Sequence, residues 1–149
     1  MPRKMTLSFS QRYLSYIYHG SPIKIPAVHI KLIDHSGNSL KTFALGDSGA
    51  TSSFMPREIA EIFEDIKTIE HSEATGAGGS FQTEIGVFAV QVIKGKKTYW
   101  SHDVMFHIPL EEGRIPYVIL GRDSIFQAYN ITFREKDQKT IFRRIKNRK

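Results

Sequence analysis

Short apolar runs alternate with polar and glycine-rich turns along the chain, a pattern typical of β-strands. Apolar and polar side chains alternate over residues 28–32, which predicts a half-buried strand because successive side chains of a strand point to opposite faces. Residues 34–38 are dense in turn formers, and residues 40–45 resume an extended run. The first clear unit is therefore a hairpin whose second strand ends at Asp47.

The pattern after residue 55 predicts two short helices among further strands. Pro56 in a first turn, followed by apolar side chains on one face, indicates a helix over residues 56–63. One or two helical turns are expected over residues 124–129. Extended segments are expected at residues 66–74, 81–93, 98–108, 117–120 and 131–145, the last of them a hairpin. The predicted fold class is mainly β, a closed β-barrel with one or two short helices.

The N-terminal segment is less regular than the rest. Residues 6–10 alternate as a short strand would, whereas residues 13–18 fit either a helix or an extended chain. Pro22 and Pro26 bar a helix across that region. We interpret residues 1–149 as a single domain, in which residues 1–22 are an N-terminal extension of undecided structure.

Length and composition exclude several classes of protein. A chain of 149 residues suits one domain. There is no run of about 18 apolar residues, so no membrane partner is expected, and no secretory signal is recognisable at the N-terminus. The absence of cysteine excludes disulfides and thiolate metal sites and fits a cytoplasmic protein.

The net charge of +6 raises the question of nucleic-acid binding. Much of the excess positive charge lies in residues 142–149, at the end of the chain. A basic tail is more often a solvated terminus than a recognition surface. Nucleic acid is therefore not an expected partner.

The chemistry-bearing stretch is residues 45–52, in which Asp47 is followed by Ser48 and Gly49. Two neighbouring carboxylates that share one proton can activate a water molecule and protonate a leaving amine, because both cannot ionise cheaply when close together. Glycine lets a substrate strand approach closely. Only one such motif occurs in the chain, so a symmetric dimer would have to supply the second carboxylate.

Three stretches in this order carry a resemblance to a known family. They are Leu45–Ala50, Thr75–Gly79 and Ile119–Asp123. The chain resembles the retropepsin-like, or retroviral-type, aspartic proteases, a group that includes single-domain archaeal and bacterial members and the protease domain of DNA-damage-inducible proteins. The similarity runs from about residue 25 to residue 145. It implies a closed β-barrel of the acid-protease type.

The resemblance also implies an aspartic endopeptidase that acts on peptide or protein substrates as a homodimer, without a cofactor or metal. Each subunit would contribute Asp47 as its catalytic residue. Ser48 would make interlocking hydrogen bonds at the base of the dyad, Gly49 would accept the substrate backbone, and Ala50 would complete the loop. The flap over the substrate would comprise Thr75, Gly76, Ala77, Gly78 and Gly79. The third matching stretch would pack behind the catalytic loop and would comprise Ile119, Leu120, Gly121 and Arg122.

One position departs from the family pattern. Viral members often carry an acidic residue where this chain has Thr51. In those proteins the acid pairs with the arginine at the position of Arg122. Arg122 must therefore have another partner, either Asp123 or an acidic residue across the dimer.

Two alternatives remain open from the sequence. The first is a serine hydrolase, in which Ser48 is the nucleophile, His29 or His35 the base and Asp34 the orienting acid. Only 47 residues precede Ser48, too few for the first barrel of such enzymes. The second alternative is a catalytically silent retropepsin-like module for dimerisation or peptide binding, with Asp47 as a structural turn residue.

Overall fold

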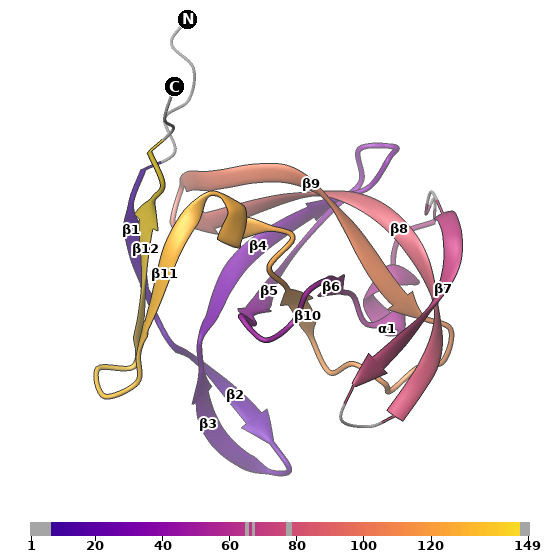
Figure 1. The fold of residues 1–149 in the computed structure, drawn as a ribbon, viewed down its shortest axis with the longest axis horizontal. Helices are drawn as coiled ribbons and strands as arrows, with labels where there is room; N and C mark the ends of the chain where they lie inside the picture. The colour runs from indigo at the N-terminus through magenta and orange to yellow at the C-terminus, as the bar shows by residue number, and fades with distance from the viewer. Residues whose placement is uncertain (1–6, 65, 67, 77–78, 147–149) are drawn as a thin grey trace, which may run out of the picture.

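Strands make up most of the chain in the computed structural model, which describes residues 7–64, 66, 68–76 and 79–146. The strands, shown in Figure 1, are β1 (Phe9–Arg12), β2 (Leu14–Tyr18), β3 (Ser21–Ile25), β4 (Ala27–Ile33), β5 (Ser39–Gly46), β6 (Ser53–Phe54), β7 (Thr68–Gly76), β8 (Gly79–Lys94), β9 (Lys97–Pro109), β10 (Val118–Leu120), β11 (Tyr129–Arg134) and β12 (Lys139–Arg144). The helical segments are α1 (Arg57–Ala60) and the 3₁₀ helix η1 (Ile125–Gln127).

Six strands close into a ring. Their order is β4-β5-β10-β6-β9-β8, and β8 pairs back with β4, while β7 adds to the other edge of β8. The β5–β10 and β6–β9 pairings are parallel, and the other pairings of this sheet are antiparallel. The prediction of a mainly β, closed barrel with one or two short helices is confirmed, and the arrangement is consistent with the acid-protease type.

The core lies inside this ring and follows the alternation seen in the sequence. In β4, Ile30 and Leu32 are fully buried, whereas His29 between the apolar positions is exposed. The other large, fully buried side chains come from around the ring and from the segment after it: Met55, Phe88, Val90, Val92, Phe106, Ile108, Val118, Leu120, Ile125 and Tyr129. A one-residue slip in register would expose these side chains, so their burial fixes how the strands pair.

The N-terminal extension forms two separate structures. β1 pairs with β12 in a three-stranded sheet of order β1-β12-β11, while β2 and β3 pair only with each other. His19 and Gly20 connect β2 to β3 with positive φ angles of 49° and 80°, as a two-residue hairpin turn of type I′ requires. Residues 13–18, undecided from the sequence, are therefore extended. The β2–β3 hairpin projects from the lower side of the molecule in Figure 1.

α1 is shorter than the sequence predicted, because it ends at Ala60 rather than near residue 63, whereas η1 is a single turn within the one or two turns predicted for residues 124–129. The side chain of Arg57 fixes α1 to the barrel. Its guanidinium forms a largely buried ion pair with Glu84 at 2.9 Å, and its Nε donates to the carbonyl oxygen of Pro109 over 2.7 Å. Within the described residues, no helix has the length and apolarity that crossing a membrane would need.

Candidate active site

Asp47 lies directly after β5, at a point where the backbone is held from both sides. Its N–H donates to the carbonyl oxygen of Leu120 over 3.0 Å, which extends the parallel β5–β10 pairing by one residue. On the other side, the N–H of Gly46 donates to the carbonyl oxygen of Pro26 over 3.3 Å. Backbone hydrogen bonds to two neighbouring segments of the barrel therefore fix the position of this residue.

The turn after Asp47 closes on its own side chain. Oδ1 of Asp47 accepts a hydrogen bond from the N–H of Gly49 over 2.9 Å, and the N–H of Ala50 donates to the Asp47 carbonyl oxygen over 3.1 Å. A Cβ atom on Gly49 would lie 3.2 Å from Oδ1, so glycine keeps this turn tight. The Asp47 side chain is half-buried, and within the described residues its Oδ2 has no hydrogen-bond partner. One carboxylate oxygen is thus fixed and the other is available.

The chain then crosses the end of β10. This crossing brings together the two predicted stretches, residues 45–50 and residues 119–123. The N–H of Arg122 donates to the carbonyl oxygen of Ala50 over 2.8 Å. The buried hydroxyl of Ser53 accepts the N–H of Gly121 over 3.0 Å and donates to Oδ1 of Asp123 over 2.8 Å.

Gly121 is required at this crossing for steric reasons. A Cβ atom there would lie 2.2 Å from the carbonyl oxygen of Ser52 and 2.9 Å from that of Ala50. Both distances are far inside van der Waals contact, and both involve backbone atoms that hydrogen bonds and strand pairing hold in place. The sequence identified Gly121 by resemblance, and the structure supplies the physical reason for it.

A cleft of about 530 Å³ opens beside Asp47. Its lining residues come from the loop after β5, from β6, from the ends of β7 and β8, and from the segment around β10: Asp47, Gly49, Ala50, Thr51, Phe54, Ala74, Thr75, Phe81, Arg114, Ile115 and Ile119. Most of these side chains are apolar, and the two charged ones are Asp47 and Arg114. The cleft can therefore hold apolar side chains next to a carboxylate.

The segment predicted as a flap forms one wall of this cleft. β7 and β8 pair as far as Gly76 opposite Gly79, and the hydroxyl groups of Thr75 and Ser80 lie 2.9 Å apart across the pair. Gly79 has a φ angle of 96°, which favours glycine. Ala77 and Gly78, also predicted for the flap, lie outside the described residues.

The loop before β10 supplies residues that sequence reasoning missed. The guanidinium of Arg114 pairs with Glu111 at 3.0 Å and lies 5.6 Å from the centre of the Phe81 ring. The loop itself is fixed to α1, because the N–H of Gly113 donates to Oε2 of Glu58 over 2.9 Å. No sequence motif marks Arg114 or Phe81, and only the fold places them at the cleft.

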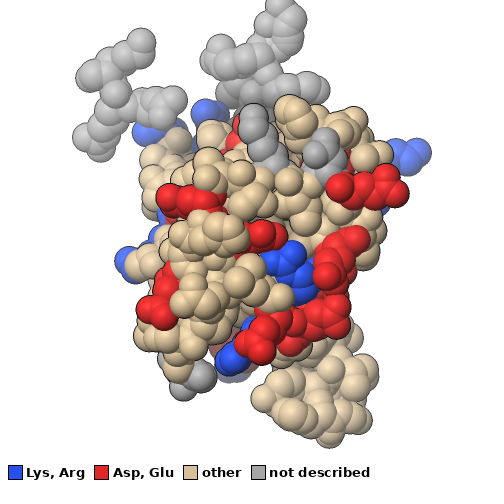
Figure 2. Space-filling model, turned by 90° about the vertical axis from the view of Figure 1, so that its right-hand side faces the viewer, with Lys and Arg blue, Asp and Glu red and all other residues tan. Residues whose placement is uncertain are grey.

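The surface around this loop is acidic. Figure 2 shows Asp and Glu side chains gathered on the side of the molecule that carries α1 and the flap strands. A hydrogen bond that protonated Glu112 donates to Glu61, repulsion by the Glu61 charge, loss of solvent, and further repulsion by Glu58 raise the pKa of Glu112. The protonated form of Glu112 is therefore favoured by its neighbours.

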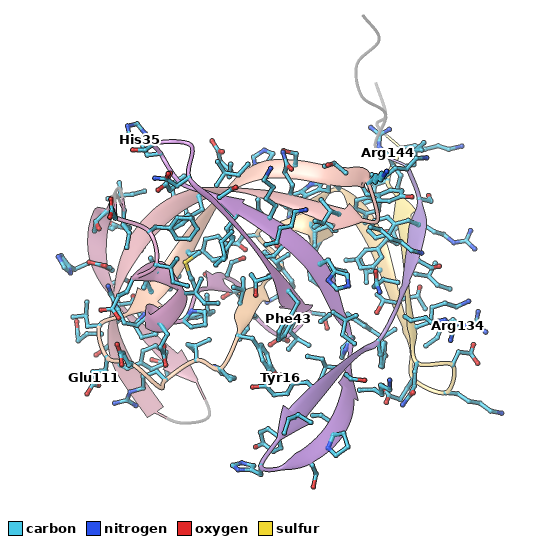
Figure 3. All side chains as sticks on the ribbon, turned by 180° about the vertical axis from the view of Figure 1, so that it is seen from behind. Tyr16, His35, Phe43, Glu111, Arg134 and Arg144 are labelled. Atoms are coloured by element: carbon cyan, nitrogen blue, oxygen red, sulfur yellow. The ribbon has the colours of Figure 1, made fainter. Side chains whose placement is uncertain are left out.

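Three aromatic rings connect the β2–β3 hairpin to the side of the barrel that carries Asp47. Tyr16 packs edge-on against Tyr117, with ring centres 5.1 Å apart, and lies 6.0 Å from the ring of Phe43. Figure 3 shows Tyr16 and Phe43 at the base of the hairpin. Burial raises the pKa of Tyr117, with further contributions from Tyr16, Asp47 and Tyr18. Tyr117 thus packs against the hairpin just before β10, the strand whose Leu120 carbonyl oxygen accepts the N–H of Asp47.

Within the described residues, Arg122 does not pair with Asp123, the local partner that the sequence suggested. Asp123 accepts its hydrogen bond from Ser53, and the ion pairs of the described residues join Arg57 to Glu84, Arg114 to Glu111, and Arg134 to Asp137. Within the described part of one chain, Arg122 therefore pairs with no acid, and an acidic residue across a dimer is the alternative that remains.

The residues of a serine-hydrolase site are not assembled. Asp34 accepts hydrogen bonds from the N–H groups of Ser36 and Asn38 and from the Asn38 amide, in the turn at the far end of β4. That turn lies beyond the Ile33–Ser39 pair, about 20 Å along the strands from Leu45 at ~3.3 Å per residue. Within the described residues, no hydrogen bond joins Ser48 to His29 or His35. The described residues also contain no group of three acidic or histidine side chains that could hold a metal ion.

No family model matches the sequence, and no curated protein matches it. Solved structures do resemble it. A crystal structure of a retropepsin-like aspartic protease from Rickettsia conorii is 16% identical and covers 95% of this chain and 96% of its own, with a TM-score of 0.48. EIAV protease complexed with the inhibitor HBY-793 is 20% identical and covers 70% and 88%, with a TM-score of 0.48. The protease of simian foamy virus (mac) is 17% identical and covers 66% and 90%, with a TM-score of 0.43. Because all identities are low and all TM-scores are below 0.5, we infer the function of this chain from its own site.

Proposed function

We propose that the chain is an aspartic endopeptidase that is active as a homodimer, with one Asp47 from each subunit in a shared dyad. The observation that carries this proposal is the state of the Asp47 carboxylate. One oxygen is fixed by the N–H of Gly49, while the other is unpaired and borders a cleft of about 530 Å³. Asp34, a buried turn aspartate, by contrast has both oxygens engaged in hydrogen bonds.

The chemistry follows from two carboxyl groups that share one proton. The ionised Asp47 takes a proton from a water molecule as the water oxygen attacks the peptide carbonyl carbon. The protonated Asp47 of the second subunit gives its proton to the carbonyl oxygen. The tetrahedral intermediate then collapses: the first Asp47 gives its newly acquired proton to the amide nitrogen, which leaves as the amine. The ionised Asp47 of the second subunit takes a proton from a hydroxyl of the intermediate as the carboxylic acid forms, which restores the shared proton. No acyl-enzyme forms, and neither a metal nor a cofactor takes part.

The substrate would be an extended peptide lying between the flap strands and the catalytic loop. Extended peptides bind by adding strand-like backbone hydrogen bonds, and pockets for alternate side chains supply specificity. The exposed Gly49 leaves room for the peptide backbone, and Phe54, Ile115 and Ile119 offer an apolar surface to its side chains. Ser48 is also exposed, so it is free to bond with the second copy of the loop.

The non-enzymatic alternative is a module that dimerises or binds peptides without cleaving them. It shares the cleft and the dimer with the protease but makes no use of the unpaired Oδ2 of Asp47. Turnover of a peptide therefore separates the two functions.

The test is cleavage of an unstructured protein by the purified chain. We expect cleavage that is fastest below neutral pH, because one carboxyl group must stay protonated. Statine-type inhibitors, which mimic the tetrahedral intermediate, should bind tightly, and chelators should have no effect. Activity that rises steadily into the alkaline range, or cleavage that ignores statines, would contradict the dyad.

A further inference from the structure

The β2–β3 hairpin (residues 14–25) carries an unusually apolar surface for an exposed segment. Ile17, Tyr18 and Ile23 are 63%, 55% and 40% exposed. Lys24 is the only Lys, Arg, Asp or Glu in residues 14–25, and its ammonium group donates to the hydroxyl of Ser15 over 2.8 Å. In Figure 2 the hairpin forms the lowest lobe of the molecule, and no charged side chain surfaces on it in that view. Exposed apolar clusters of this kind mark interaction sites.

The hairpin has little support of its own. Its two strands pair only with each other, over five residue pairs. An isolated two-stranded hairpin is marginally stable in water. A partner that covers the apolar side chains would therefore also stabilise the hairpin.

The apolar face of the hairpin is directed to the catalytic side. Tyr16 and Tyr18 share one face of β2, and Ile23 lies opposite Tyr16 on the same face of β3. Tyr16 packs against Tyr117. The carbonyl oxygen of Pro26, directly after β3, accepts the N–H of Gly46, the residue before Asp47. The exposed continuation of this face therefore extends from the side of the barrel that carries Asp47.

A second copy of the chain fits this face better than a substrate does. No residue of the hairpin lines the cleft, so a peptide bound there leaves the hairpin uncovered. A shared proton requires the two Asp47 carboxylates to lie about 3 Å apart, which brings surfaces beside Asp47 against the partner. The partner is in any case needed to complete the site.

The surface area that a specific dimer must bury also favours a contact between the hairpin and a second copy of the chain. Specific dimers bury about 800 Å² on each partner, some 20 residues a side. The catalytic loop, residues 47–50, is far too small for this, and the strands nearest the two chain ends, β1 and β12, already pair with each other within one chain. In an isologous interface each arm binds the other subunit, so the contribution of one hairpin is doubled.

We infer that the β2–β3 hairpin is a dimerisation arm, whose Tyr18 and Ile23 bind the second copy of the chain beside the shared active site. This inference rests on the homodimer proposed above.

The test compares the double variant Tyr18→Asp/Ile23→Asp with Met105→Asp. Met105 on β9 is 56% exposed and lies outside the cleft lining, so it matches the hairpin residues in exposure but not in place. Sedimentation equilibrium over a range of concentrations gives the dimer Kd. We expect the hairpin variant to raise Kd at least about tenfold and Met105→Asp to leave it unchanged.

A second measurement does not depend on the charged variants folding. Because the chain contains no cysteine, Tyr18→Cys and Met105→Cys each create a single reactive thiol. The rate at which a soluble reagent modifies Cys at position 18 should fall as protein concentration passes through Kd, while the rate at position 105 stays constant. A modification rate at position 18 that is the same at all protein concentrations would contradict the dimerisation arm.

The outcomes separate the two proposals. A wild-type dimer that binds statines, with hairpin variants of unchanged Kd, contradicts the arm and leaves the protease intact. Hairpin variants that raise only the KM for a peptide assign the hairpin to the substrate and also contradict the arm. A wild-type chain that is monomeric at every concentration contradicts both proposals.

Discussion

The loop at residues 47–50, which contains Asp47, and the β2–β3 hairpin, which ends beside Gly46, are held in opposite ways. The loop is fixed by backbone hydrogen bonds, from Asp47 to Leu120 and from Arg122 to Ala50, and by the buried hydroxyl of Ser53. The hairpin contacts the barrel at its base, through the ring of Tyr16 and the buried Ile25, while its outer apolar side chains are exposed. The carboxylate that we propose as catalytic is thus secured within one chain, and the surface that we propose as a dimer contact is exposed.

This difference has a physical reason. Catalytic groups must stay within a fraction of an ångström of their working positions, which rigid elements and hydrogen bonds provide. An interface instead gains its free energy when apolar surface leaves water, so it must be exposed beforehand. Each of the following predictions breaks or sharpens this comparison.

The largest effect is expected at the carboxylate itself. Asp47→Asn keeps the size and the Gly49 hydrogen bond but removes the base, so peptide cleavage should fall by at least about 10³-fold, measured as kcat/KM. The variant should remain folded and dimeric. Asp103→Asn, at an exposed position on β9, is the matched control and should retain activity. Undiminished cleavage by Asp47→Asn would refute the catalytic assignment.

The crossing of the loop over β10 is tested by Gly121→Ala. The new methyl group would meet the Ser52 carbonyl at 2.2 Å, so the free energy of unfolding should fall by about 2 kcal/mol or more, measured by urea denaturation. At Gly46 the nearest atom to an added methyl is on the Phe126 side chain, 3.9 Å away, so Gly46→Ala should cost much less. Equal losses for the two variants would mean that the crossing is not a special constraint.

The attachment of the hairpin is tested by Tyr16→Ala. Loss of the contacts with Tyr117 and Phe43 removes roughly 0.5–1.5 kcal/mol per aromatic pair. Because the hairpin pairs with no other strand, the loss should show as faster amide exchange within residues 14–25 and not as global unfolding. Tyr18→Ala should change the exchange rates of the monomer little. Faster exchange throughout the barrel in Tyr16→Ala would show that the two regions are not held independently.

The smallest effect is expected at Tyr117, between the two regions. Its pKa is raised by burial and by Tyr16, Asp47 and Tyr18, so the folded state favours the neutral phenol. The resulting stability is present below the unfolded pKa of about 10 and is lost as pH rises through the folded pKa. Tyr117→Phe cannot ionise, so the difference in unfolding free energy between the two proteins should be constant below about pH 9 and should shift in favour of the variant above pH 10. A constant difference up to pH 12 would contradict this environment for Tyr117.

The features that the residues themselves predicted are governed by local constraints. A Cβ atom on Gly49 would crowd Oδ1 of Asp47 at 3.2 Å, and the alternation in β4 predicted its buried face. These two features follow from a few neighbouring residues and need no knowledge of the whole fold. Gly121 is identified by resemblance alone, because its constraint comes from Ala50 and Ser52, which are distant in the sequence.

The missed parts depend on contacts between distant segments. Tyr16 meets Tyr117, and Arg114 meets Phe81, only because the barrel closes. Residues 13–18 were undecided because their apolar positions fit both periodicities. The available signal was His19–Gly20, a turn in which both residues take positive φ. Recognising that turn would have predicted the hairpin.

The most direct test of the shared dyad is a crystal structure of the chain with a statine-type inhibitor. We predict a symmetric dimer in which the two Asp47 carboxylates lie about 3 Å apart and both contact the inhibitor hydroxyl group. A monomer, or a dimer in which each Asp47 faces solvent away from its mate, would contradict the proposed enzyme.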